Sequence, residues 1–204
     1  MKKNLIFWLS ISALSLAPIA LVSNSYAQMN MGTSSSMNMG TKAMVALERL
    51  TGKKFDIAWM SQMIQHHKGA LEMARACVKT CKEPDVKKAA QTIIGAQTKE
   101  IAQMTGWLKS WYGVLPDKTQ MALMQGDMKS MMDSSMAGMV PMEGMAHADK
   151  AFLEGMIPHH QGAVDMAKVA LTKAARPELK KFAQQVINDQ SKEIKQFQAW
   201  LKKL

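Results

Sequence analysis

The sequence predicts an all-α protein, an antiparallel four-helix bundle formed by two duplicated helical hairpins that a methionine-rich linker joins. A shift of 93 residues aligns residues 56–109 with residues 149–202 without a gap, and 24 of the 54 aligned positions are identical, which indicates an internal duplication. Apolar residues recur at helical spacing in both copies, and each copy has a proline-containing turn near its centre. One two-helix hairpin cannot bury both of its apolar faces, whereas two hairpins packed together can.

Residues 1–27 have the features of a secretory signal peptide. Lys2 and Lys3 precede an apolar run over residues 5–22, and Ser25-Tyr26-Ala27 is a small-residue cleavage pattern. The alternative is an uncleaved membrane anchor, but serines and a proline interrupt the run, and a membrane span usually needs about 20 apolar residues. We therefore expect cleavage after this pattern, export to the periplasm or the extracellular space, and no stable membrane insertion of the mature chain.

The chain is basic, with a formal net charge of +10 that falls to +8 once the two lysines of the signal peptide are removed. A basic chain raises the question of nucleic-acid binding. The lysines are spread over the expected helix faces, and no basic strip interleaved with aromatic residues occurs. We therefore expect no nucleic-acid partner. No nucleophile elbow or phosphate loop supports a hydrolase or a transferase.

Methionine is the unusual feature of the composition, with 21 residues against 5 phenylalanines and 2 tyrosines. Methionine is a flexible filler of protein cores, but its thioether is also a soft ligand that suits Cu(I). Residues 28–52 contain five methionines, and the first part of this segment is rich in serine, glycine and asparagine. We expect a flexible N-terminal segment there, with a short helix over residues 41–50.

The two hairpins are expected to occupy residues 53–112 and 148–204. On the opening helix of each hairpin, polar residues recur on one face and apolar residues on the other. Pro84 and Pro177 stand at corresponding places and are each followed by an acidic residue, which is typical of the first turn of a helix. Pro158 lies inside the second opening helix, and we expect it to kink or break that helix because proline removes a backbone hydrogen bond.

Two adjacent histidines lie at the same place in both hairpins, within MIQHHKGALEMA (63–74) and MIPHHQGAVDMA (156–167). The centre of the apolar stripe falls on these pairs, so their rings need partners inside the bundle. Each ring could hydrogen bond to a carboxylate or a carbonyl across the bundle, or a metal ion could satisfy several rings at once. The candidate ligands on these helices are Met63, His66, His67, Met73, Met156, His159, His160 and Met166.

The ligand types around the histidines favour copper. A di-iron bundle would carry Glu-x-x-His motifs, whereas a methionine stands three residues before each histidine pair. The His-x-x-x-His spacing of many helical zinc sites is absent from the sequence. Thioether and imidazole ligands together suit Cu(I), and Ag(I) can substitute for it.

Residues 113–147 form a linker that contains glycine and proline and is rich in methionine. From Met136 the methionines follow Met-x-x-Met spacing, and the glycines and proline between them oppose a continuous helix. This run resembles the flexible thioether ligands of copper-trafficking proteins. The alternative, an amphipathic methionine stripe that docks on the bundle, fits residues 121–132 better. The candidate ligands of the linker are Met128, Met132, Met136, Met139, Met142, Met145 and His147.

Cys77 and Cys81 are the two cysteines of the chain. Two cysteines in an exported protein usually pair, although a spacing of four on a helix requires the helix end to unwind a little. The other hairpin has Ala170 and Ala174 at these places, so the cysteines are not part of the shared motif. We expect a small local disulfide, and a thiolate copper site is the alternative.

The two copies of MIxHHxGA, at 63–70 and 156–163, each followed by Met-Ala, resemble the exported domain-of-unknown-function family 305. The resemblance covers residues 56–203 with the linker. It implies a ferritin-like four-helix bundle, a periplasmic or secreted location, and copper binding that protects the cell. It does not assign individual ligands.

We therefore predict an exported, non-catalytic protein that sequesters or carries Cu(I) through methionine and histidine ligands and contributes to copper resistance. Its partners would be copper ions and copper efflux or transfer proteins. Two other functions stay open at this point. A copper-dependent redox enzyme, such as a cuprous oxidase, would turn over Cu(I), and a methionine-rich interaction module would bind a protein without metal.

Overall fold

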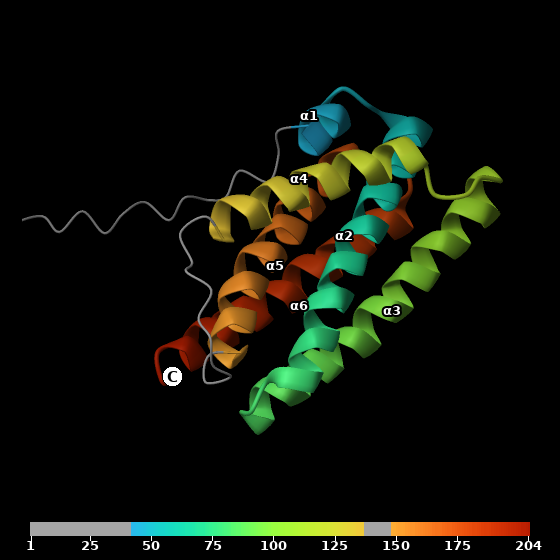
Figure 1. Cartoon of the computed structure of the whole chain (residues 1–204). Helices are drawn as coiled ribbons and strands as arrows, with labels where there is room; N and C mark the ends of the chain where they lie inside the picture. Colours follow the sequence, from blue (N-terminus) through green and yellow to red (C-terminus); the bar gives the residue numbers. More distant parts are fainter. Residues whose placement is uncertain (1–41, 137–147) are drawn as a thin grey trace, which may run out of the picture. The chain divides into compact units, whose positions relative to one another are not determined.

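The computed structural model describes residues 42–136 and 148–204, and this part of the chain contains helices and no strands (Figure 1). The all-α prediction is therefore confirmed. The helices are α1 (Lys42–Glu48), α2 (Gly52–Thr80), α3 (Pro84–Tyr112), α4 (Lys118–Met136), α5 (Ala148–Lys173) and α6 (Pro177–Leu201).

Helices α2 and α3 pack against each other as one hairpin, and α5 and α6 form the other. Pro84 and Pro177 are the first residues of α3 and α6, where the missing N–H costs no helical hydrogen bond. Helix α2 also packs against α5, so the two hairpins meet through their opening helices (Figure 1). These packing pairs are consistent with a helical bundle.

One aspartate in each hairpin binds the turn of the other hairpin. Asp149 of α5 accepts hydrogen bonds from the backbone N–H groups of residues 82 and 83, in the turn between α2 and α3, at 2.9 and 3.0 Å. Asp56 of α2 accepts bonds from residues 175 and 176, in the turn between α5 and α6, at 2.9 and 3.2 Å. Because each contact joins the start of one opening helix to the end of the other, α2 and α5 are antiparallel.

The apolar core consists of two clusters that are separated at the histidine pairs. One cluster joins the first half of α2 to the second half of α5, where the indole nitrogen of Trp59 donates to the carbonyl oxygen of Met166 at 2.9 Å. The second cluster joins the second half of α2 to the first half of α5 and includes Met156 and Phe197. The histidines therefore lie between two apolar regions that hold α2 and α5 together.

The first part of the linker is a helix that docks on the bundle. Helix α4 packs on α2, and α1 contacts both of these helices. Met124 and Met128 of α4 are buried, and Asp127 accepts a hydrogen bond from the backbone N–H of Ala43 in α1 at 2.8 Å. Met124 and Met128 therefore dock on the bundle, as the alternative of an amphipathic methionine stripe at residues 121–132 predicted.

The break that we expected at Pro158 is absent, because α5 runs continuously from Ala148 to Lys173. Proline removes one backbone donor, but residues on both sides of it are held by packing. Met156 and His159 are buried on either side of Pro158, so both halves of the helix are anchored in the core.

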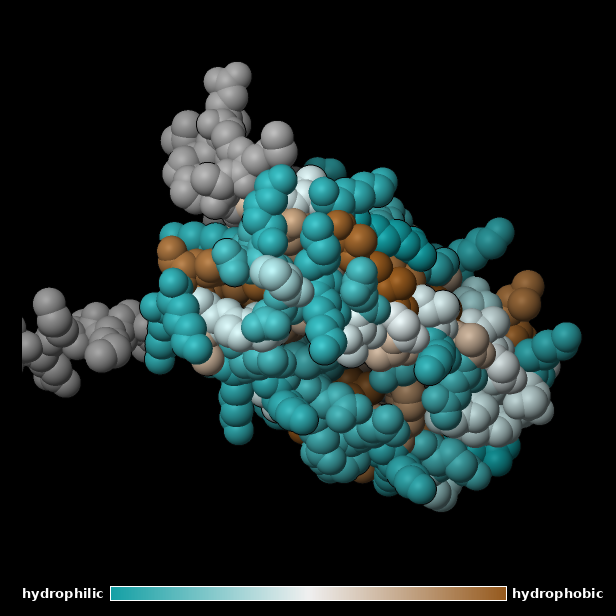
Figure 2. Space-filling view, turned by 90° about the horizontal axis from the view of Figure 1, so that it is seen from below, coloured by the Kyte–Doolittle hydropathy of each residue, from teal (hydrophilic) through white to brown (hydrophobic). Residues whose placement is uncertain are grey.

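The described surface is mostly polar. Figure 2 shows a face dominated by hydrophilic residues, with hydrophobic side chains visible between them. Among the described residues, the large hydrophobic side chains that are exposed are Val45, Leu115 and Leu204. No helix in the same part of the chain is long and apolar enough to cross a membrane.

Candidate metal centre

The four histidines of the paired motifs meet where α2 packs on α5. His66, His67 and His160 are 0% exposed and His159 is 1% exposed. The ring centroids of His66 and His159 are 3.9 Å apart, and the ring planes are inclined by 43°. The duplication therefore brings one histidine of each hairpin into direct contact in the interior.

The two histidines of a pair have different partners because successive residues of an α-helix point in directions about 100° apart. His66 and His159 face each other across the two opening helices. His67 and His160 instead reach the closing helix of their own hairpin. Each histidine pair thus supplies both a contact between the hairpins and a contact within its own hairpin.

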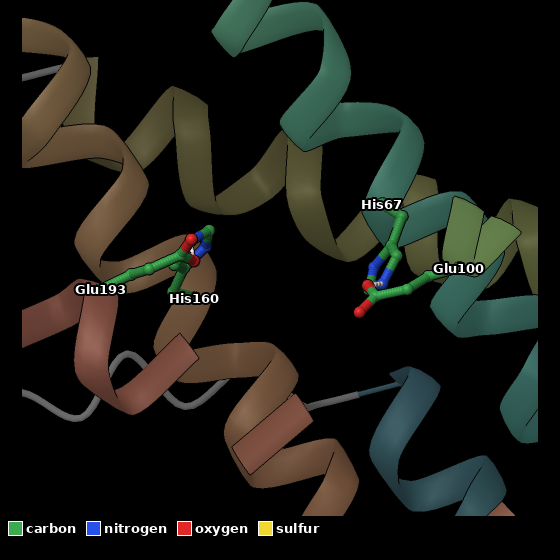
Figure 3. Close-up of polar contacts among 4 residues, drawn as sticks. All are labelled: His67, Glu100, His160 and Glu193. Carbon is green, nitrogen blue, oxygen red and sulfur yellow. Dashed lines mark hydrogen bonds and ion pairs between the residues drawn. The ribbon is translucent and has the colours of Figure 1, made fainter. Parts of the chain in front are cut away.

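A glutamate holds the second histidine of each pair. The Nε2 atom of His67 lies 2.7 Å from Glu100 Oε2, and the Nε2 atom of His160 lies 2.7 Å from Glu193 Oε2. Figure 3 shows both pairs, with the histidines on α2 and α5 and the glutamates on α3 and α6. An ionised carboxylate accepts the Nε2 proton, which leaves the lone pair on Nδ1. Carboxylates that orient histidines in this way are common behind metal ligands.

Six buried ring nitrogens have no hydrogen-bond partner among the residues that the structure describes. They are both nitrogens of His66, both nitrogens of His159, and the Nδ1 atoms of His67 and His160. An unpaired buried polar atom costs about 1–3 kcal/mol, so a group of them in one place needs an explanation. A metal ion that accepts their lone pairs would supply one.

Burial keeps the central rings neutral. Burial, followed by the repulsion of the neighbouring histidines, lowers the pKa of His66 well below its ordinary value. The same causes, burial first and then His160 and His67, lower the pKa of His159 to about 3. A neutral imidazole keeps a free lone pair at physiological pH, and this is the form that binds metals.

Buried methionines lie on the same helices. Met63, Met156 and Met166 are 0% exposed, whereas Met73 is half-buried. Met63 and Met166 belong to one core cluster, and Met73 packs against the other cluster, which contains Met156. Thioethers from both hairpins therefore lie in the apolar regions on either side of the histidines.

Helix α4 adds a further thioether beside the central histidines. A Cβ atom built on Gly69 would lie 3.4 Å from His159 Nε2 and 3.6 Å from Met128 Sδ, and it would overlap the Met128 methyl group. The imidazole and the thioether therefore share the space over this glycine. The absence of a side chain at position 69 leaves room for both.

The remaining candidates of the linker contribute no described side chain. Met132 and Met136 belong to α4, but their side chains lie outside the described part. Met139, Met142, Met145 and His147 fall between residues 137 and 147, which are also outside it. Their role as ligands stays a prediction.

The cysteines and carboxylates that the structure describes do not form a metal site with the histidines. Cys77 and Cys81 form a disulfide with their Cα atoms 4.8 Å apart, and Cys81 is in an extended conformation just after the end of α2. No cysteine thiol is free for a thiolate copper site. Among the described residues, no three His, Cys, Asp or Glu side chains form a group that could hold a metal ion. Methionine sulfur is not among these four ligand types.

Sequence reasoning did not identify the polar partners on the closing helices. Glu100 and Glu193 each follow their histidine by 33 residues. Gln97 and Gln190 lie one helical turn before these glutamates, and each buries an amide oxygen without a partner in the described part of the chain. Glu100 aligns with Glu193, and Gln97 aligns with Gln190, in the two repeats. Glutamate and glutamine are usually exposed, so their identity in both repeats was the signal in the sequence that pointed to these partners.

These features define a duplicated helical protein whose interior carries paired histidines and methionines. The model of the DUF305 family, a domain of unknown function, matches residues 8–108 and 80–201. The chain belongs to this family. No curated protein matches the chain.

Solved structures of similar fold include CopM and two DUF305 proteins. CopM in its Cu(II)-bound form is 31% identical, with a TM-score of 0.58, over 72% of this chain and 97% of CopM. CopM is also known in Cu(I)-bound and Ag-bound forms. A DUF305 fragment from Deinococcus radiodurans is 31% identical over 73% of this chain and 96% of the fragment, with a TM-score of 0.59. A DUF305 protein from Streptomyces coelicolor is 26% identical over 72% and 92% of the two chains, with a TM-score of 0.61.

Proposed function

We propose that this protein is an exported, non-catalytic copper-binding protein that holds Cu(I) with imidazole and thioether ligands and contributes to copper resistance. The observation that carries the proposal is the contact of His66 with His159, two neutral, fully buried rings without partners in the described residues. CopM, which has Cu(I)-bound, Cu(II)-bound and Ag-bound forms, supports it.

The donor set suits a soft monovalent ion. Neutral imidazole and thioether ligands neutralise no charge, so they hold Cu(I) more readily than a divalent ion that needs anionic ligands. His66, His159 and the Met128 thioether are the first ligands that we propose, because the space over Gly69 brings the last two together. His67 and His160 would add their Nδ1 atoms, oriented by the glutamates.

Binding within the bundle would keep copper away from water and from redox cycling. Ag(I) has similar ligand preferences and would compete for the same sites. We propose a periplasmic or extracellular location, with which the disulfide is consistent, and copper efflux or transfer proteins as partners. We also propose that the four long helices of the hairpins form a ferritin-like four-helix bundle.

The test is a Cu(I) titration of the purified protein against a competing chelator under anaerobic, reducing conditions. Two variants separate the sites: one replaces His66, His67, His159 and His160 with alanine, and the other replaces Met136, Met139, Met142 and Met145 with serine. We expect the histidine variant to bind Cu(I) about a hundredfold more weakly at the bundle site, because it loses every imidazole ligand. Circular dichroism shows whether each variant is folded.

The second variant reports on the linker. A lower stoichiometry with an unchanged bundle affinity would assign additional copper ions to the Met-x-x-Met run. A protein that binds no Cu(I) in this assay would contradict the proposal. Continuous oxidation of Cu(I) by the pure protein in air would contradict its non-catalytic part.

A further inference from the structure

A partly open pocket of about 340 Å³ lies between α3 and α6. Its walls carry two carboxylates, Asp85 and Glu193, and one cation, Lys88, so the net charge of the lining is negative, which favours the approach of a cation. Its walls include Asp85, Ala89 and Thr92 of α3 and Glu193, Phe197 and Trp200 of α6. The function proposed above makes no use of this pocket.

The pocket is separated from the buried histidines by one layer of side chains. Glu193, which lines the pocket, places Oε2 2.7 Å from His160 Nε2 (Figure 3). Phe197, another wall residue, has its ring centroid 5.8 Å from that of His160. The side chain of Glu193 is 26% exposed, so one carboxylate touches both the solvent and the histidine cluster.

The repeat provides an internal comparison, because a larger side chain stands at the position that aligns with Ala89. Phe182 corresponds to Ala89 in the alignment of the repeats, and Trp107 corresponds to Trp200. The Phe182 ring is 4% exposed and packs edge-on against Trp107, with 5.5 Å between centroids. Glu100, which corresponds to Glu193, is accordingly less exposed, at 17%. The larger side chain that aligns with Ala89 therefore accompanies a glutamate with less solvent contact.

We propose that the pocket between α3 and α6 is the entrance through which a monovalent copper ion reaches the histidine cluster, with Glu193 as the carboxylate that joins the pocket to His160. The inference rests on the proposed copper-binding function. Crossing a close-packed apolar layer is strongly unfavourable for a cation. A carboxylate that touches both solvent and His160 lowers this barrier, and the equivalent carboxylate, Glu100, has less solvent contact where Phe182 replaces Ala89.

The test closes the entrance without altering the proposed ligands. Ala89→Phe installs the residue that the other hairpin carries at this position. Cu(I) supplied as its acetonitrile complex is mixed rapidly and anaerobically with the protein that carries the four linker serines, so that the linker does not contribute. The variant in which alanine replaces His66, His67, His159 and His160 identifies the kinetic phase of copper uptake that belongs to the bundle, because this variant should lack it. We expect this phase to slow about tenfold or more in Ala89→Phe, with Kd changed less than about threefold.

Further variants exclude a general effect of added bulk. Thr92→Phe fills the pocket from an exposed position whose hydroxyl donates to the carbonyl oxygen of Lys88, and it should slow uptake as Ala89→Phe does. Gln91→Phe adds the same ring at an exposed position outside the pocket, and it should leave the rate unchanged. Phe182→Ala combined with Ala89→Phe opens the equivalent route, and it should restore fast uptake.

The outcomes distinguish this inference from the function on which it rests. Uptake at the original rate in folded Ala89→Phe and Thr92→Phe proteins, with normal affinity, would overturn the entrance alone. Equal slowing by Gln91→Phe would also overturn it. If the unmodified protein fails to bind Cu(I), the proposed function fails, and the entrance fails with it.

Discussion

His66 and His67 are neighbours in the chain, yet their rings lie in different environments. His66 contacts His159 of the other hairpin and has no hydrogen bond in the described residues, whereas His67 is held by Glu100. The helical rotation between adjacent residues explains this division. The carboxylate partner, which the sequence left as an alternative to metal ligation, is therefore found for His67 and not for His66.

Replacing both central histidines with leucine is expected to stabilise the metal-free protein while removing copper from the bundle. Leucine fills a similar volume and buries no unpaired nitrogen, so the free energy of unfolding should rise by about 1–3 kcal/mol. Urea denaturation of His66→Leu/His159→Leu with a copper chelator present measures this change. Adding Cu(I) should then stabilise the original protein but not the variant. A variant that is less stable without metal would show that the rings contribute favourable packing.

The same variant should be less sensitive to acid. Because burial lowers the pKa of His66 and brings that of His159 to about 3, the unfolded chain binds protons between pH 6.5 and pH 3 that the folded chain does not. The free energy of unfolding therefore keeps its full value above pH 6.5. It falls as the pH decreases below 6.5, by at most about 1.4 kcal/mol per pH unit for each ring. Denaturation curves from pH 7 to pH 5 should be flatter for the variant. Equal slopes would contradict the buried neutral state.

Among the helices, α2 and α5 correspond in the two repeats, but only α2 ends at a disulfide. The end of α2 is closed by the disulfide between Cys77 and Cys81, whereas α5 has Ala170 and Ala174 at these places. Both cysteines are buried in the core cluster that contains Met156 and Phe197. The alanines of the other repeat show that the hairpin turn forms without the crosslink.

The variant Cys77→Ala/Cys81→Ala is therefore expected to keep the fold and lose little stability. A crosslink that closes so short a loop contributes about 2 kcal/mol or less in the chain-entropy account. Denaturation in urea measures the loss, and a Cu(I) titration serves as the control. Copper affinity should be unchanged, because the bundle site uses no thiolate. A marked fall in affinity would show that this helix end also positions the ligands.

At the scale of the whole molecule, the two repeats complete each other. Asp56 and Asp149 each bind the turn of the opposite hairpin, and His66 of one repeat contacts His159 of the other. The apolar faces of α2 and α5 are buried against each other. Separation of the repeats would expose these faces and leave the turn N–H groups without their carboxylates.

Neither half should therefore form a folded monomer. Residues 42–113 and residues 114–204, expressed separately, are expected to be poorly helical or self-associated, and to recover helical structure as a one-to-one complex when mixed. Circular dichroism and light scattering follow the recovery. Asp149→Ala in the second piece should weaken the complex, since two N–H groups of the opposite turn lose their acceptor. A stable folded monomer of either piece would contradict this view.

The sequence predicted the four long helices of the hairpins and the faces that they bury, although it left α4 as an alternative and predicted a kink or break at Pro158. The period of apolar residues predicted the hairpins, Pro84 and Pro177 marked the start of their closing helices, and the alignment of the repeats placed both histidine pairs on the buried stripe. These features are local, because each depends on residues within a few turns of one helix. Membership of the DUF305 family also followed from such a local motif.

Which buried face meets which became clear only from the folded molecule. Its packing places Glu100 and Glu193 against one histidine of each pair, Met128 of α4 beside His159, and a pocket at Ala89, where the other repeat has Phe182. These contacts join residues that are far apart in the chain. Their choice depends on how side chains of different sizes pack between helices, which the periodicity of a single helix does not contain.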